Sequence, residues 1–117
     1  MAMNSTEKQK KKLTEKQKKK KKLVDRDGLS CRWCKKLQLE DQLTLEHLRP
    51  KSKDGSDRLI NLCLACSKCN QKRGDKPFPP GYPPTWKDIF QLVFLFIFDH
   101  RLIEPPSFMT WIEQFQI

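Results

Sequence analysis

The stretch LEHLRPKSKDGSDRLINLCLACSKCNQKRGDK, residues 45–76, decides the fold of this 117-residue chain. Two short apolar segments, residues 43–49 and 59–65, flank a polar loop, and each is expected to form a strand. Residues 68–73, which follow the second strand, are expected to form a short helix that ends at Gly74. The order of strand, long loop, strand and short helix predicts a small α+β core.

Two Cys-x-x-Cys pairs frame this core. Each pair places two thiolates on one side of a tight turn, and two such turns can close a tetrahedral zinc site whose four positions are all filled by protein. A site of this kind is structural, and it suits a chain whose core is too small to fold unaided. The expected zinc ligands are Cys31, Cys34, Cys66 and Cys69.

A fifth cysteine, Cys63, creates an ambiguity, because Cys63 and Cys66 are also spaced as Cys-x-x-Cys. Cys63 lies inside the second expected strand, where a thiol packs as a small apolar side chain. Cys66 and Cys69 instead flank the turn from strand to helix. We therefore assign Cys63 to the core, and the odd number of cysteines argues against a set of disulfides.

Residues 31–76 resemble an HNH endonuclease of the ββα-metal type with a four-cysteine zinc site. The matching features are CRWC, an acidic residue and a His ahead of a Pro, the glycine-containing polar loop, Asn-Leu in the second strand, and CxxCN before a basic-Gly end. The resemblance implies a zinc-stapled ββα-metal (HNH, His-Me finger) core, with residues 25–76 as the nuclease domain. It also implies an enzyme that hydrolyses DNA phosphodiester bonds with a divalent metal ion.

The resemblance assigns roles to individual residues. His47 is expected to be the general base that activates water, and Glu46 and Asn70 are expected to hold a catalytic Mg²⁺ or Mn²⁺ ion. Asn61 is expected to fix the loop and the geometry of His47. The family usually has Asp where this chain has Glu46, and the extra methylene moves the ligand oxygen by about 1.5 Å.

The geometry of a strand limits this assignment. Neighbouring residues of a regular strand point to opposite faces, so Glu46 and His47 can serve one site only if the strand ends or bulges there. Pro50 and the loop after it allow that. The alternative function is a zinc-stabilised nucleic-acid-binding module without catalysis, which needs the cysteines and a basic surface but no grouping of His47 with Glu46 and Asn70.

The charge of the chain is +10 overall, with +8 in residues 1–22 and −2 in residues 77–117. Residues 1–24 have little apolar surface to bury, so we expect a disordered Lys-rich arm that attracts phosphates. DNA is the expected partner. Further candidate phosphate contacts are Lys51, Lys53, Arg58, Lys68, Lys72 and Arg73.

The last forty residues differ from the core in composition. A Pro-rich linker, residues 77–84, precedes an apolar, aromatic-rich extension, residues 85–117. Thr85 and the Asp three positions later resemble a capping box that begins a helix running to about Arg101, although a strand is a rival interpretation. A second short helix is expected from Ser107. The extension either packs on the core or forms a surface for a second copy or another protein.

The chain contains no apolar run of the roughly 20 residues that a membrane span requires. Its basic N-terminus also lacks the apolar stretch of a signal peptide. We therefore expect a cytoplasmic, nucleic-acid-associated protein with no membrane partner.

Overall fold

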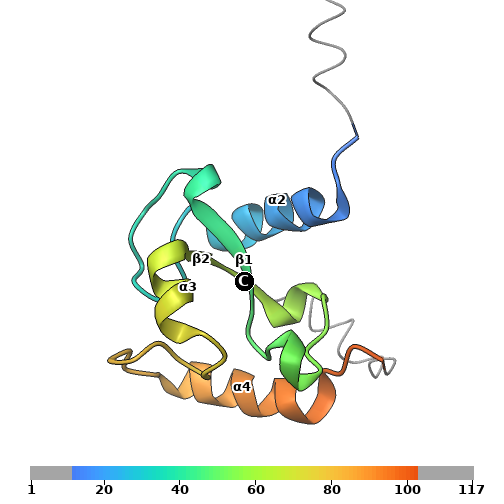
Figure 1. The fold of residues 1–117 in the computed structure, drawn as a ribbon, viewed down its shortest axis with the longest axis vertical. Coiled ribbons are helices and arrows are strands. Elements are labelled where there is room, and N and C mark those ends of the chain that lie inside the picture. The colour runs from blue at the N-terminus through green and yellow to red at the C-terminus, as the bar shows by residue number, and fades with distance from the viewer. Residues whose placement is uncertain (1–11, 103–117) are drawn as a thin grey trace, which may run out of the picture.

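The computed structural model describes residues 12–102 and confirms a small α+β fold. A two-stranded antiparallel hairpin lies at its centre, with α2 and α3 beside the hairpin and α4 across the end from which the long loop emerges (Figure 1). The main elements are α2 (Glu15–Asp27), β1 (Leu43–His47), β2 (Leu62–Cys66), α3 (Ser67–Arg73) and α4 (Trp86–Phe98). Short 3₁₀ turns occur at Glu40–Gln42, Lys51–Lys53 and Leu59–Asn61.

The hairpin pairs Leu43 with Cys66 at one end and His47 with Leu62 at the other. Every residue of β2 is buried, because helices and the Cys31 turn surround this strand. Both strands lie where the sequence predicts them, with shifted ends. β2 starts three residues late, since Leu59–Asn61 forms a 3₁₀ turn first.

The prediction of disorder is wrong for residues 15–24, which form most of α2. Thr14 and Gln17 make a capping box, in which each backbone N–H donates to the other side chain, at 2.8 and 3.1 Å. Leu23 is fully buried in the core, and Arg26 donates to two backbone carbonyls at the start of β2. The cap, the buried Leu23 and the Arg26 contacts support this helix, whereas repulsion among its neighbouring lysines opposes it. Residues 1–11 of the arm lie outside the described part of the chain.

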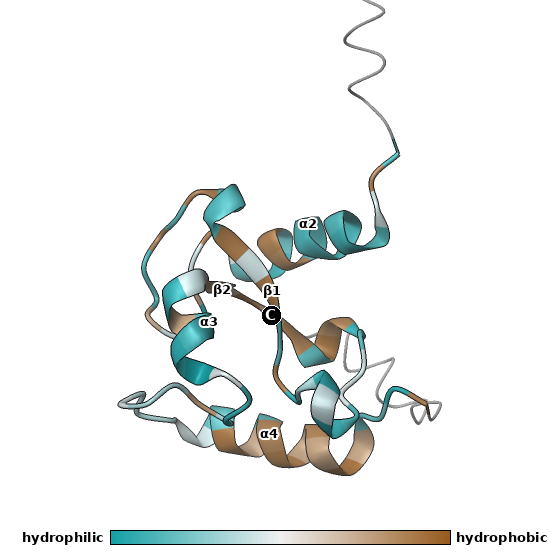
Figure 2. Ribbon diagram, in the orientation of Figure 1, coloured by the Kyte–Doolittle hydropathy of each residue, from teal (hydrophilic) through white to brown (hydrophobic). Residues whose placement is uncertain are grey.

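α4 is a helix and not a strand, and both hydrogen bonds of the expected capping box at Thr85 and Asp88 are present. The helix ends at Phe98, three residues before the predicted end. Leu95 is fully buried, whereas Phe90 is 72% exposed, so one side of α4 presents apolar surface outward (Figure 2). The second expected helix, from Ser107 onward, lies outside the described residues.

The segment predicted as a Pro-rich linker, residues 77–84, joins the core. Phe78 and Tyr82 stack on each other, with ring centroids 5.7 Å apart, and both meet the Trp33 ring edge-on. This cluster attaches the start of α4 to the first cysteine turn. No helix within residues 12–102 combines the length and apolar character needed to cross a membrane.

Candidate nuclease site and metal centre

The four predicted zinc ligands lie together. The sulfur atoms of Cys31, Cys34, Cys66 and Cys69 are all within 4.8 Å of one another. A zinc ion with Zn–S bonds of 2.3 Å would need sulfurs about 3.8 Å apart, so only a small contraction would complete the tetrahedron. The residues present therefore fit a four-thiolate metal ion.

Local backbone structure brings the two pairs together. The first turn closes when the Lys35 N–H donates to the Cys31 carbonyl at 3.0 Å, with Lys35 in the left-handed region at φ 64°. The Arg32 N–H donates to Leu64 O of β2 at 2.8 Å, which ties this turn to the strand that leads into Cys66. Cys66 ends β2, and Cys69 lies one turn into α3.

The thiols of this cluster differ in pKa. Burial opposes ionisation of Cys66, but hydrogen bonds from the Cys69 backbone and from neighbouring thiols outweigh it and lower the pKa of Cys66 to about 6. Burial and hydrogen bonds with the thiols of Cys66, Cys31 and Cys34 raise the pKa of Cys69 to about 12. A lowered thiol pKa, as at Cys66, favours the thiolate form that binds metal.

Cys63 belongs to the core, as predicted. It is fully buried in β2, and burial raises the pKa of its thiol to about 12. It is not a member of the four-sulfur group.

Asn61 holds the loop between the two strands. Its Oδ1 accepts from the Arg49 N–H at 2.7 Å, and its Nδ2 donates to the carbonyls of Arg49 at 3.1 Å and Ser56 at 2.8 Å. Asn61 is fully buried, so this amide replaces backbone pairing that the loop lacks. Gly55 is required beside it, because a Cβ there would lie 1.7 Å from the Arg49 carbonyl oxygen.

The structure places Glu46 and His47 on opposite faces of β1. Glu46 and Thr44 face α3, where Asn70 Nδ2 donates to Thr44 Oγ1 at 3.4 Å. His47 faces the other way and lines a cavity of about 270 Å³ together with α2 residues that include Lys19. The strand neither bulges nor ends before His47, so Glu46 and Asn70 share a face that His47 does not.

Glu46 is paired with a buried arginine. Arg73 has no exposed surface, and its Nη1 lies 3.1 Å from Glu46 Oε1. Arg73 also donates to the carbonyls of His47 at 2.7 Å and Leu48 at 2.5 Å. Arg73 therefore cannot be the phosphate contact that its sequence position suggested, because its donors are consumed inside the protein.

The second carboxylate oxygen of Glu46, Oε2, is buried without a hydrogen-bond partner. Burial raises the pKa of Glu46, and the charge of Arg73 opposes the rise. Asn70 is half-buried and uses its amide nitrogen on Thr44, which leaves its Oδ1 as an acceptor. An unpartnered carboxylate oxygen and an amide oxygen on one face are ligands that Mg²⁺ or Mn²⁺ accepts. The donor set fits the predicted ion on the α3 face.

His47 has a partner that the sequence analysis missed. Its Nε2 lies 2.7 Å from Asp57 Oδ1, and this hydrogen bond is the main reason that the pKa of Asp57 falls below its ordinary value. Lys51 lies 3.6 Å from the same carboxylate oxygen, and Lys19 donates to the Asp57 carbonyl at 2.7 Å. The signal in the sequence was only an acidic residue in the loop that returns toward His47.

The other predicted phosphate contacts differ in exposure. Arg58 is partly buried and directed at the end of α4, where its Nη1 donates to the His100 carbonyl at 3.0 Å. The lysines are exposed and remain available: Lys51, Lys53, Lys68 and Lys72.

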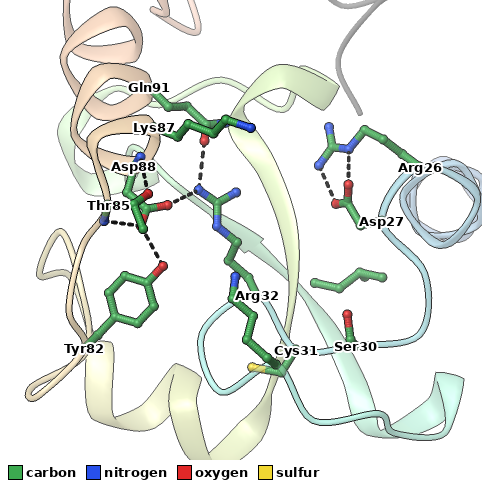
Figure 3. A pocket seen from close by; sticks show the side chains of 12 residues that line it. Arg26, Asp27, Ser30, Cys31, Arg32, Tyr82, Thr85, Lys87, Asp88 and Gln91 are labelled. Atoms are coloured by element: carbon green, nitrogen blue, oxygen red, sulfur yellow. Dashed lines mark hydrogen bonds and ion pairs between the residues drawn. The ribbon is translucent and has the colours of Figure 1, made fainter.

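A larger cavity, of about 460 Å³, lies between the end of α2, the Cys31 turn and the start of α4 (Figure 3). Its two carboxylates are already paired, Asp27 with Arg26 at 2.7 Å and Asp88 with Arg32 at 3.1 Å. These pairs leave no free acidic ligand there, so the cavity offers no second metal site.

Comparison with known proteins supports the resemblance to the HNH endonuclease family. Residues 31–78 match the family model described as HNH endonuclease. No curated protein matches the sequence. Among solved structures, the Type II-C Cas9 enzyme from Actinomyces naeslundii matches with a TM-score of 0.52 and 18% identity, over 82% of this chain and 14% of that chain.

This chain therefore spans about a seventh of the length of that enzyme, and at this identity the likeness concerns the fold. The family match covers both cysteine pairs, both strands and α3, together with His47, Asn61 and Asn70. The resemblance to the HNH endonuclease family is therefore confirmed for residues 31–78.

Proposed function

We propose that this chain is a metal-dependent endonuclease that hydrolyses DNA phosphodiester bonds, with His47 as the general base. The observation that carries the proposal is the His47–Asp57 pair, which lies within a segment that matches the HNH endonuclease model. Asp57 is an acceptor, so it selects the neutral imidazole tautomer with the proton on Nε2. The lone pair is then on Nδ1, where it can take a proton from water.

The position of β1 supports action on one phosphate from both faces of the strand. β1 pairs with β2 along one edge, and no other strand of residues 12–102 lies along its second edge. β1 has neither the bulge nor the end before His47 that would bring Glu46 and His47 to one face. We propose instead that a phosphate lies across this edge near His47, with His47 on one face of β1 and Glu46 and Asn70 on the other.

In the proposed reaction, His47 Nδ1 removes a proton from a water molecule as its oxygen bonds to phosphorus. The bond from phosphorus to the leaving 3′-oxygen breaks, and that oxygen takes a proton from solvent. Glu46 Oε2 and Asn70 Oδ1 would hold Mg²⁺ or Mn²⁺, which when bound supplies positive charge for the crowded phosphate and the leaving oxygen. Exposed lysines of the loop and of α3 would hold the flanking backbone without choosing a base sequence.

The four cysteines would hold a structural Zn²⁺ ion in this proposal. Cys31, Cys34, Cys66 and Cys69 fill all four positions of a tetrahedron, which leaves none open for substrate. Zinc would therefore stabilise the fold without taking part in the reaction.

A second candidate function is a zinc-stabilised nucleic-acid-binding module without catalysis. The Glu46–Arg73 pair favours it, because a buried arginine already neutralises the carboxylate that should hold the catalytic ion. The exposed lysines serve this function equally well.

A plasmid-nicking assay separates the two functions. Wild type with Mg²⁺ or Mn²⁺ should convert supercoiled plasmid to the nicked form, and His47→Ala should slow this by about 10²–10⁴-fold, as expected for loss of a general base. His100→Ala is the matched control and should nick at the wild-type rate, because the His100 ring lies beside Asp54 and not beside Asp57. Equal nicking by His47→Ala would remove the proposed base. Plasmid binding without nicking in every variant would establish the binding module.

A further inference from the structure

A buried carboxylate at the end of α4 holds the loop that carries Asp57. Asp99 is the first residue after α4 and has no exposed surface. Its Oδ2 accepts from the Ser56 N–H at 2.9 Å, and its Oδ1 accepts from the Ser56 hydroxyl at 2.5 Å. Arg58 Nη1 lies 3.5 Å from Oδ1 and supplies an opposite charge. Asp99 thus accepts hydrogen bonds from both the N–H and the hydroxyl of Ser56, the residue that directly precedes Asp57.

The other side of the same loop is attached to α4 as well. Arg49 donates to the Asp99 carbonyl and to Lys53 O at 2.6 Å, and its guanidinium lies 4.9 Å from the centre of the Phe96 ring. The Arg101 N–H donates to Asp54 O at 3.0 Å. The end of α4 is therefore hydrogen-bonded to the loop both before and after the Lys51–Lys53 turn.

Apart from His47, the partners of Asp57 are two lysines: Lys19 donates to its carbonyl at 2.7 Å, and Lys51 lies 3.6 Å from Oδ1. Its side chain is 57% exposed, and the preceding 3₁₀ turn, Lys51–Lys53, lies fully on the surface. Ser56, in contrast, is buried and held through its backbone as well as its hydroxyl. Asn61 also holds the Ser56 carbonyl, at 2.8 Å. The position of the Asp57 carboxylate relative to His47 therefore depends on how firmly Ser56, the residue before it, is held.

We propose that Asp99 is a positioning residue for His47: by holding Ser56, it keeps Asp57 against His47 Nε2. The inference rests on the proposed function, because it matters for cleavage only if His47 is the base. Asp99 lies outside residues 31–78, so this support comes from the part of the chain beyond the family match. Asp99 touches neither His47 nor the expected phosphate position, so its effect on the reaction passes through Ser56 and Asp57.

The test follows the His47 ring directly, by ¹⁵N NMR of the full zinc-loaded chain. Wild type should show the Nε2-protonated tautomer with a hydrogen-bonded N–H, and Asp57→Ala should lose it. Asp99→Asn should move the His47 ring signals most of the way toward those of Asp57→Ala. Asp88→Asn is the matched control, because Asp88 is also a buried carboxylate of α4 beside an arginine, but at the far end of the helix. It should leave the His47 signals at their wild-type positions.

Ser56→Ala keeps the test decisive if Asp99→Asn does not fold, since it removes the hydroxyl donor to Asp99 and leaves the Ser56 N–H donor in place. It also removes an acceptor of the Arg58 N–H at 3.2 Å. It should shift the His47 signals in the same direction by a smaller amount. Wild-type His47 signals in Asp99→Asn, or in Ser56→Ala when Asp99→Asn does not fold, would overturn the proposal. An equal shift in Asp88→Asn would also overturn it, because the effect would then be general loosening of α4.

Nicking kinetics provide the second readout. Asp99→Asn should lower kcat about tenfold and leave KM for plasmid within about twofold, because the lysines that bind backbone are untouched. A rise in KM alone would contradict a positioning role. If no variant nicks DNA, the proposed function fails, and the NMR comparison still decides whether Asp99 positions His47.

Discussion

Among single residues, Arg73 shows how the site is built into the core. Its guanidinium is fully buried, and burial lowers its pKa while Glu46 opposes that change. It contacts one carboxylate and the carbonyls of three other residues, which satisfies most of its donors. A buried cation with so many partners fixes the end of β1 against α3, because no alternative position would satisfy those groups.

Arg73→Met should therefore destabilise the fold by about 3–5 kcal/mol, since it leaves the half-buried Glu46 carboxylate and three backbone carbonyls without their partner. Chemical denaturation of the zinc-loaded protein would measure the change. Lys72→Met, on the exposed side of the same helix, is the control and should change stability by less than about 0.5 kcal/mol. Similar losses from both substitutions would show that the buried pair has no special role.

The cysteines divide into four expected zinc ligands and one core residue, Cys63, and this assignment leads to a second prediction. Cys66→Ser should abolish stoichiometric zinc binding and unfold the domain, because one of the four ligands is lost. Cys63→Ala removes a buried thiol from the same strand and should keep one zinc ion per chain. Metal analysis of the purified variants checks both, and loss of zinc from Cys63→Ala would mean that the ligands are wrongly assigned.

Spacing predicted the two cysteine pairs, and the family resemblance predicted that Asn61 fixes its loop. They did not predict Asp57 or Asp99. Asp57 meets His47 only after the loop has folded back over ten residues, and Asp99 meets Ser56 across 43 residues. Neither contact leaves a periodic or spacing signal, so each depends on how α4 and the loop pack.

Among the elements, α2 shows how composition can mislead. Ten lysines in residues 1–22 indicated disorder, yet Thr14 and Gln17 match a capping-box pattern and mark a helix start. Leu23 then supplies the buried contact. For α4, in contrast, the capping box was predicted from the sequence. Its nearly continuous apolar residues, however, do not indicate which side of the helix is buried.

The cap of α4 predicts a pH dependence of stability. Burial alone would raise the pKa of Asp88, but the Thr85 N–H, the Tyr82 hydroxyl and Arg32 donate to its carboxylate and lower that pKa below its ordinary value (Figure 3). A lowered pKa in the folded state means that this contribution is present above the ordinary Asp value and is lost as the pH falls through the folded value.

Asp88→Asn should accordingly reduce the free energy of unfolding by about 1–2 kcal/mol at pH 7, as for loss of a helix cap. The difference from wild type should shrink below about pH 4, as the wild-type carboxylate takes up its proton. Urea unfolding across pH 2.5–7 measures it. A difference that grows toward low pH would contradict the assigned direction of the pKa shift.

Across the whole molecule, the family-matched segment contains the proposed catalytic and metal-binding residues, and elements outside it pack against that segment. Residues 31–78 contain the cysteine cluster, the hairpin and α3. α2 lines the cavity of His47 with lysines, and α4 holds the loop through Asp99. α4 both packs on the core, through Leu95, and presents an exposed apolar side that includes Phe90. A partner for that side, one of the two alternatives for residues 85–117, stays a prediction.

The central claim is that one divalent ion binds on the α3 face of β1, between Glu46 and Asn70, while His47 serves the same phosphate from the other face. Mn²⁺ titration of the ¹⁵N-labelled, zinc-loaded chain tests it directly, because bound Mn²⁺ broadens the resonances of nearby nuclei. At substoichiometric Mn²⁺, the Asn70 side-chain amide and the Glu46 backbone amide should broaden first, and Asn70→Ala should abolish that broadening. Broadening that begins instead at the exposed acidic pair Glu40 and Asp41, and persists in Asn70→Ala, would contradict the claim.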